Sequence, residues 1–118
     1  MARSRVSRRQ ERVARNEAAT RDINEDIERT YLEEGLSPSG AGHVRVLCEC
    51  GRDDCDRLLV ITLGEYEAVR ADPRRFAVVP SHVMRDVEEV VDRTDRYVVV
   101  AKRVGAPAAA AIEQDPRS

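Results

Sequence analysis

The sequence contains very few aromatic residues and no long apolar segment. Among its 118 residues there are three Tyr, one Phe and no Trp. Its apolar runs, such as residues 58–61 and 97–101, have the length of a β-strand, whereas a membrane-spanning helix needs about 20 residues. The arginine-rich start is not followed by an apolar stretch, so no secretory signal is predicted. We therefore exclude a membrane helix and expect a cytoplasmic protein.

The sequence also lacks an overall excess of charge of either sign. Twenty Lys and Arg residues against 22 Asp and Glu residues give a net charge of −2, which excludes a uniformly basic nucleic-acid-binding protein. The charges are instead separated along the chain, because residues 1–15 carry a net charge of +5 and residues 16–35 carry −5. The positive block consists of Arg3, Arg5, Arg8, Arg9, Arg12 and Arg15, together with one acid, Glu11.

Residues 8–34 contain no Pro or Gly, and we predict that they form one long helix ending at Gly35. Its apolar stripe is narrow and consists of Val13, Thr20, Ile23, Ile27 and Tyr31. A helix this polar is not expected to lie deep in a core. We expect it to rest on the remainder of the protein by its C-terminal half, or to pair with another helix.

Composition divides the chain into four parts. We expect residues 1–36 to form a charged helical arm and residues 37–42, Ser-Pro-Ser-Gly-Ala-Gly, to form a linker. Residues 43–103 contain most of the apolar side chains and are predicted to form one compact domain. Residues 104–118 have little to bury, so a disordered tail is expected there.

Within the compact domain, the apolar pattern predicts an α+β fold with a small, mostly antiparallel sheet in the order β-β-α-β-α-β. The first helix has a capping-box spacing between Thr62 and Glu65. The last strand is apolar on both faces and is therefore expected at the centre of the sheet. The predicted strands are residues 44–48, 58–62, 76–79 and 97–101, and the predicted helices begin at Thr62 and cover residues 86–93.

All three cysteines lie within eight residues, in the segment Cys48-Glu-Cys50-Gly-Arg-Asp-Asp-Cys55. In an extended chain, residues i and i+2 point to the same side, so Cys48 and Cys50 can converge on one ion. Gly51 can adopt a positive φ and turn the chain back, which brings Cys55 to the same point. Thiolates are soft ligands that suit zinc. We therefore predict a zinc knuckle on a hairpin.

A fourth ligand must come from elsewhere in the chain, and His82 is the preferred candidate. It follows Pro80 at the end of a predicted strand, where a fixed loop can return to the hairpin. His43 precedes Cys48 by five residues, about 16 Å along an extended chain, which makes it a poorer candidate. Asp53 or Asp54 could also complete the set.

A structural zinc ion would supply folding free energy to a domain of this size, whose core alone gives marginal stability. A complete set of three cysteines and one histidine leaves no open position for catalysis, whereas three cysteines and a water would permit hydrolytic chemistry. Three alternatives remain: ordinary buried thiols, a disulfide with one odd cysteine, and a thiol redox switch promoted by Arg52 and Arg57.

The cysteine segment and the residues after it resemble a group of small, uncharacterised proteins from high-GC bacteria of the actinobacterial type. The shared pattern is Cys-x-Cys-Gly, then Cys55, then Thr-Leu-x-Glu-Tyr-Glu-x-Val-Arg, then Asp-Pro-x-Arg-Phe-x-Val-x-Pro-x-His82 and Asp-Arg-Tyr-Val-Val-Val. The resemblance extends over about residues 8–103. It implies that the three cysteines and His82 belong together, and it implies no particular activity.

No catalytic pattern accompanies the metal signal, because the chain has no nucleophile–histidine–acid spacing and no glycine-rich phosphate loop. We expect a non-enzymatic regulatory or adaptor protein that binds a protein partner, or a second copy of itself, through Ile23, Ile27 and Tyr31. One alternative is a nucleic-acid-associated regulator that uses the arginine block. The other is a thiol redox or zinc sensor.

Overall fold

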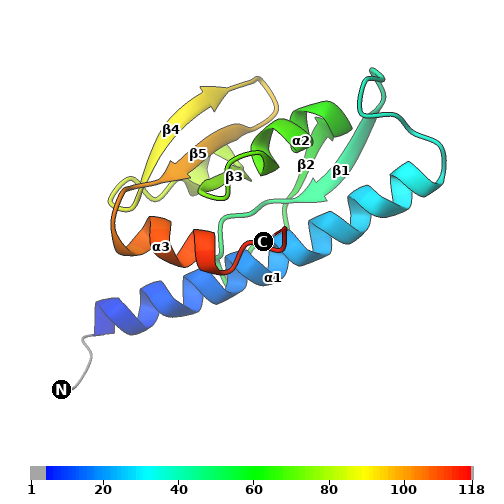
Figure 1. The fold of residues 1–118 in the computed structure, drawn as a ribbon. Helices are drawn as coiled ribbons and strands as arrows, with labels where there is room; N and C mark the ends of the chain where they lie inside the picture. Colours follow the sequence, from blue (N-terminus) through cyan, green and yellow to red (C-terminus); the bar gives the residue numbers. More distant parts are fainter. Residues whose placement is uncertain (1–4, 118) are drawn as a thin grey trace.

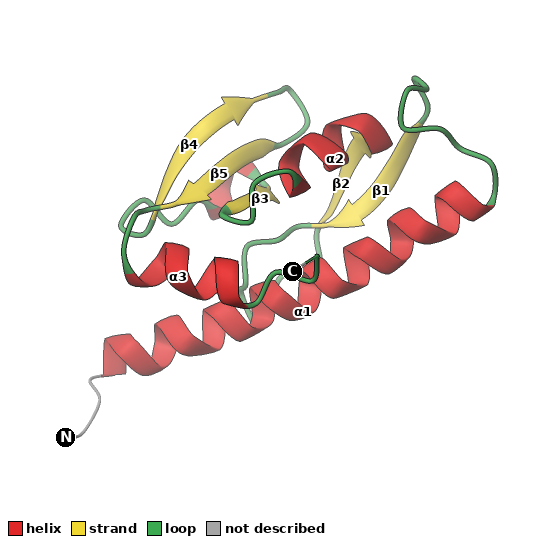
Figure 2. Cartoon of the chain, viewed as in Figure 1, coloured by secondary structure: helices red, strands yellow, loops and turns green. Residues whose placement is uncertain are grey.

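The computed structural model describes residues 5–117 and has an α+β fold built from one long helix, two small antiparallel sheets and two short helices (Figures 1 and 2). This fold class agrees with the one predicted from the sequence. In chain order the elements are α1 (Arg5–Glu33), β1 (His43–Leu47), β2 (Leu58–Thr62), α2 (Leu63–Arg70), β3 (Arg75–Val78), a 3-10 turn η1 (Pro80–His82), β4 (Glu88–Arg93), β5 (Val98–Lys102) and α3 (Ala106–Glu113).

Side chains from the two sheets form much of the core, and α1 packs against it. Strands β1 and β2 form a hairpin in which His43 is opposite Thr62 and Leu47 is opposite Leu58. The second sheet has the order β3-β5-β4, and every residue of β5 is buried. The sequence analysis correctly predicted a central position for this strand. Helix α2 begins with the predicted capping box, since Glu65 N donates to Thr62 Oγ1 and Thr62 N donates to Glu65 Oε1.

The predicted helix over residues 86–93 is wrong, because Glu88–Arg93 form strand β4. In this strand Val90 is opposite Val100 and Asp92 is opposite Val99, so Val91 is an extra, bulged residue. The bulge interrupts the two-residue alternation of the strand. The spacing of Val90 and Val91 from Val87, three and four residues, therefore indicated a helix. Residues 88–93 are extended because they pair antiparallel with β5, whose side chains are buried on both faces.

Helix α1 lies along the body of the protein rather than extending away from it as an arm (Figure 1). Its buried face carries Glu17, Arg21, Asn24 and Glu28, which recur at helical spacing. Each of these polar side chains contacts a partner on another element, so the helix is attached mainly by hydrogen bonds and ion pairs. The expectation that α1 would rest on the domain by its C-terminal half or pair with another helix did not include these polar partners, nor the contact of its N-terminal half with the body of the protein.

The C-terminal segment also differs from expectation, since residues 106–113 form helix α3 instead of a disordered tail. Figure 1 shows α3 beside the N-terminal half of α1. Arg21 Nη2 donates to Ala111 O at 2.9 Å, and Arg117 pairs with Glu25 and Glu28 of α1 and with Glu67 of α2. These polar contacts supply the stabilisation that the few apolar side chains of this segment do not. Within residues 5–117, no helix combines the length and the apolar composition required to cross a bilayer.

Candidate metal centre

The structure brings Cys48, Cys50, Cys55 and His82 together. Cys48 and Cys50 lie in the extended segment after β1, Cys55 lies in the loop before β2, and His82 is the last residue of η1. One ligand atom from each residue lies within 4.8 Å of all the others. The four side chains that the sequence analysis selected therefore form a group that could hold a metal ion.

The backbone of the cysteine loop turns at Gly51, which has a φ of 75°. The turn is closed by Cys48 N, which donates to Arg57 O at 2.9 Å, and by Cys55 N, which donates to Arg52 O at 3.4 Å. A residue with a Cβ is strained at this φ. The predicted role of Gly51, to return the chain so that the third thiol meets the first two, is confirmed.

The ligand separations agree with a tetrahedral ion. His82 Nδ1 lies 3.5 Å from Cys55 Sγ and 3.8 Å from Cys48 Sγ. A zinc ion about 2.3 Å from sulfur and about 2.0–2.1 Å from nitrogen would place a sulfur and a nitrogen ligand about 3.5 Å apart. The four side chains can therefore contact one ion of this size with little rearrangement.

Backbone amides point at each of the three sulfurs. Val79 N donates to Cys48 Sγ at 3.2 Å, and the amides of Arg52 and Arg57 donate to Cys50 and Cys55. Hydrogen bonds to a thiolate stabilise its charged form. Hydrogen bonding with Cys48 lowers the pKa of Cys50 to about 5, whereas the same contact, together with burial, raises the pKa of Cys48. The amides provide the polarity that coordinating thiolates need.

The residue between the two first cysteines, Glu49, is a fully buried carboxylate that the sequence analysis missed. Its Oε2 accepts hydrogen bonds from Tyr66 Oη at 2.8 Å and Asn24 Nδ2 at 2.9 Å. Its Oε1 accepts from Ala77 N at 3.0 Å and lies 3.5 Å from Arg70 Nη2. The cysteine segment is thus fixed from α1, α2 and β3 at once, which holds Cys48 and Cys50 on the opposite side of the chain.

Helix α1 supports the metal centre directly, and this contact was also missed. Asn16 Nδ2 donates to Gly51 O at 2.9 Å and to Asp53 Oδ1 at 2.7 Å, while Arg12 pairs with Asp53. Further along the helix, Asn24 Oδ1 accepts from Leu47 N at 2.8 Å. The helix therefore contacts the cysteine loop at both ends of the Cys-x-Cys segment.

A signal for this packing was present in the sequence. Glu17, Arg21, Asn24 and Glu28 recur at spacings of four, three and four residues, which is the periodicity of one helix face. The sequence analysis assigned the buried face to apolar residues alone. A second, polar stripe was therefore available but was not considered.

The other predicted site residues lie away from the four ligands or are exposed. His43 is exposed at the start of β1, at the opposite end of that strand from Cys48, and Asp53 and Asp54 are exposed in the loop. Arg3 and the side chain of Arg5 lie outside the described part of the chain. The remaining members of the arginine block are exposed: Arg8, Arg9, Arg12 and Arg15.

The apolar stripe on α1 is divided between core and solvent. Ile27 and Tyr31 pack against the core, while Ile23 keeps 47 % of its surface exposed. Leu32, on the same helix, is 39 % exposed. Part of the surface assigned to a partner therefore contributes to the fold of the chain itself.

Comparison with protein-family models, with curated proteins and with solved structures finds no match for this chain. The description of the metal centre accordingly depends on the arrangement of Cys48, Cys50, Cys55 and His82 and of the residues around them. That arrangement identifies a potential metal-binding protein with a compact α+β fold.

Proposed function

We propose that this protein binds one zinc ion through Cys48, Cys50, Cys55 and His82, and that the ion is structural. The observation that carries the proposal is that these four ligand atoms lie within 4.8 Å of one another, although His82 is 27 residues from Cys55 in the sequence. Three thiolates and one imidazole form a closed ligand set, which leaves no position for a substrate or a reactive water. The proposed role is therefore non-enzymatic.

The surroundings of the ligands favour zinc held for stability. Cys48 and Cys50 are buried, and the carboxylate of Glu49 beside them is fixed by four polar groups. The ion would connect the end of β1 to η1, next to the contact of Gly51 with α1. It would thus join three parts of the chain.

A regulatory or adaptor role through a protein partner is the biological function we propose for this scaffold. The support for it is Ile23, an apolar side chain of α1 that keeps 47 % of its surface exposed. The test is Ile23→Asp in a measurement of oligomeric state and of co-purifying protein. Loss of a dimer or of a bound partner supports this surface, and an unchanged result removes it.

A zinc or thiol redox sensor is the second candidate function, because Cys55 and His82 are only half-buried and lie on the accessible side of the centre. Oxidation of Cys55 would remove one ligand and release the ion. Zinc release by peroxide that a thiol reductant reverses supports a sensor. Retention of zinc under the same treatment supports a purely structural ion.

Elemental analysis of protein purified without chelator and without added metal tests the zinc proposal. We expect one zinc per chain, and we expect its loss in Cys50→Ser. A second measurement is thiol titration of the native protein, in which bound thiolates react slowly. A zinc content near zero together with three rapidly titrated thiols would refute the metal centre.

A further inference from the structure

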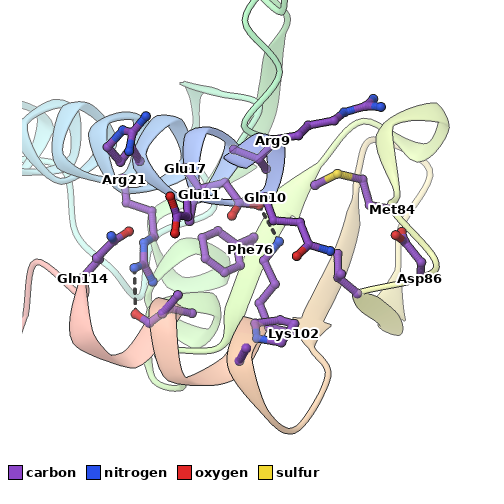
Figure 3. A pocket seen from close by; sticks show the side chains of 18 residues that line it. Arg9, Gln10, Glu11, Glu17, Arg21, Phe76, Met84, Asp86, Lys102 and Gln114 are labelled. Atoms are coloured by element: carbon purple, nitrogen blue, oxygen red, sulfur yellow. Dashed lines mark hydrogen bonds and ion pairs between the residues drawn. The ribbon is translucent and has the colours of Figure 1, made fainter. Parts of the chain in front are cut away.

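A second potential binding site is a cavity of about 730 Å³ (Figure 3). Its walls come from the N-terminal half of α1, from α3, and from the sheet and the loop before β4. Small-molecule sites have volumes of about 300–1,000 Å³. The apolar part of the lining includes Val13, Ala14, Phe76, Met84, Val87 and Pro107, together with alanines of α3.

The inner wall of the cavity carries a buried ammonium group. Lys102 Nζ donates to Glu17 Oε2 at 2.6 Å and to Glu88 Oε2 at 2.8 Å, and all three side chains are at least 95 % buried. An ammonium group has three N–H donors. Among the described residues only two of them have partners, so one N–H of Lys102 remains for a ligand.

A buried guanidinium lines the same cavity. Arg21 donates from Nη1 to Pro73 O at 2.8 Å and from Nη2 to Ala111 O at 2.9 Å. Its Nε is fully buried and has no hydrogen-bond partner among the described residues. Figure 3 shows Phe76 between Arg21 and Lys102, and the guanidinium carbon lies 4.5 Å from the ring centroid. A buried donor without a partner is unfavourable, so an acceptor at this position would stabilise the protein.

The charges of the inner wall are balanced when the cavity is empty, since Glu17 and Glu88 oppose Lys102 and Arg21. Burial raises the pKa of Glu17 to about 7. Near neutral pH this carboxyl can hold a proton, which removes its repulsion toward an incoming anion and adds an O–H donor. Lys102 and Glu17 then offer two neighbouring donors, and the two cations Lys102 and Arg21 face one remaining carboxylate of the inner wall, Glu88.

We propose that this cavity binds a small monocarboxylic acid with an apolar body. The carboxylate would accept hydrogen bonds from Lys102 and from protonated Glu17, which lie on the same side of Phe76, and the body would lie against Phe76 and the apolar residues of α1 and α3. An amine of the same size would place a positive charge beside the ammonium group of Lys102. A neutral alcohol would lack the charge that makes a hydrogen bond to Lys102 strong.

Three matched probes test the proposal on the full chain by titration calorimetry: octanoate, octanol and octylamine. We expect saturable binding of octanoate, about tenfold or more tighter than either of the others, because charge-assisted hydrogen bonds exceed neutral ones by this amount. Ala110→Phe fills the cavity and should abolish octanoate binding. Ala109→Phe, on the exposed face of the same helix, is the control and should leave it unchanged.

Several results would overturn the proposal. They are an absence of saturable octanoate binding, equal or tighter binding of octylamine, and octanoate binding that survives Ala110→Phe. Circular dichroism and the Tm of both variants show whether a loss of binding reflects unfolding. The zinc content, measured on the same samples, separates this site from the metal centre, because the cavity does not include any of the four metal ligands.

Discussion

Replacing Gly51 by alanine should destabilise the protein strongly, because two independent penalties meet at this position. The φ of 75° costs an L-residue about 1–2 kcal/mol. In addition, a Cβ at Gly51 would lie 2.7 Å from Val13 O, Val13 Cγ1 and Glu17 Cγ. Forcing atoms into a packed contact costs about 1–3 kcal/mol. The expected loss in the free energy of unfolding is therefore about 2–5 kcal/mol.

Gly35 provides the matched control for this substitution. Its φ is 99°, and a Cβ added there would meet no atom within 4 Å. Gly35→Ala should therefore lose only the conformational term of about 1–2 kcal/mol. Urea denaturation of both variants in zinc-saturated buffer gives the difference, which we expect to be about 1–3 kcal/mol.

The difference between the two variants measures the contact between α1 and the cysteine loop. Equal losses in Gly51→Ala and Gly35→Ala would refute the conclusion that the helix backbone is seated against Gly51. A further check is the double variant with Val13→Ala. It should recover only part of the loss, because the carbonyl oxygen of Val13 remains at the same place.

Three further predictions concern the metal ligand, the buried carboxylate and the pH dependence. His82→Ala should lower zinc affinity in a chelator competition while His43→Ala leaves it unchanged, and the reverse order would assign the fourth ligand to His43. Glu49→Gln should reduce the free energy of unfolding in urea by about 1–3 kcal/mol, since an amide cannot accept from all the donors around it; an unchanged value would show that the carboxylate does not fix the loop. Because the pKa of Glu17 is raised from 4.5 to about 7, its contribution to stability is present below pH 4.5 and is lost as the pH rises to about 7. Glu17→Gln should therefore flatten the decline in stability over this interval, and equal slopes in both proteins would contradict the shift.

The metal centre could be predicted from the sequence because its requirements are local. The spacing of Cys48 and Cys50, the glycine after them and the position of Cys55 determine where three thiols point. Predicting His82 as a ligand required one further inference, namely that the loop after the strand ending at Pro80 returns to the cysteine hairpin. The capping box at Thr62 and the central position of β5 were predictable for the same reason, since each depends on a short pattern.

The features that could not be predicted depend on contacts between distant residues. The polar face of α1 is buried because Lys102, Glu49 and Leu47 supply partners for it, and none of these lies near the helix in sequence. Helix α3 was missed because its few buried apolar residues are small alanines, and Arg21 and Arg117 supply the polar contacts that complete its attachment. In β4, one bulged residue, Val91, changed the apparent period of the pattern.

The long separation between α1 and its partners has a consequence for synthesis of the protein. Lys102, Ala111 and Arg117 follow Glu17, Arg21 and Glu25 by 85, 90 and 92 residues. At roughly 5–20 residues per second, the ribosome makes these partners roughly 5–20 seconds after the helix. During that time an apolar helix would expose a surface that promotes aggregation, whereas the polar face of α1 remains hydrated. The composition of this helix thus suits a segment that stays partly unpaired until its partners at residues 102–117 have been made.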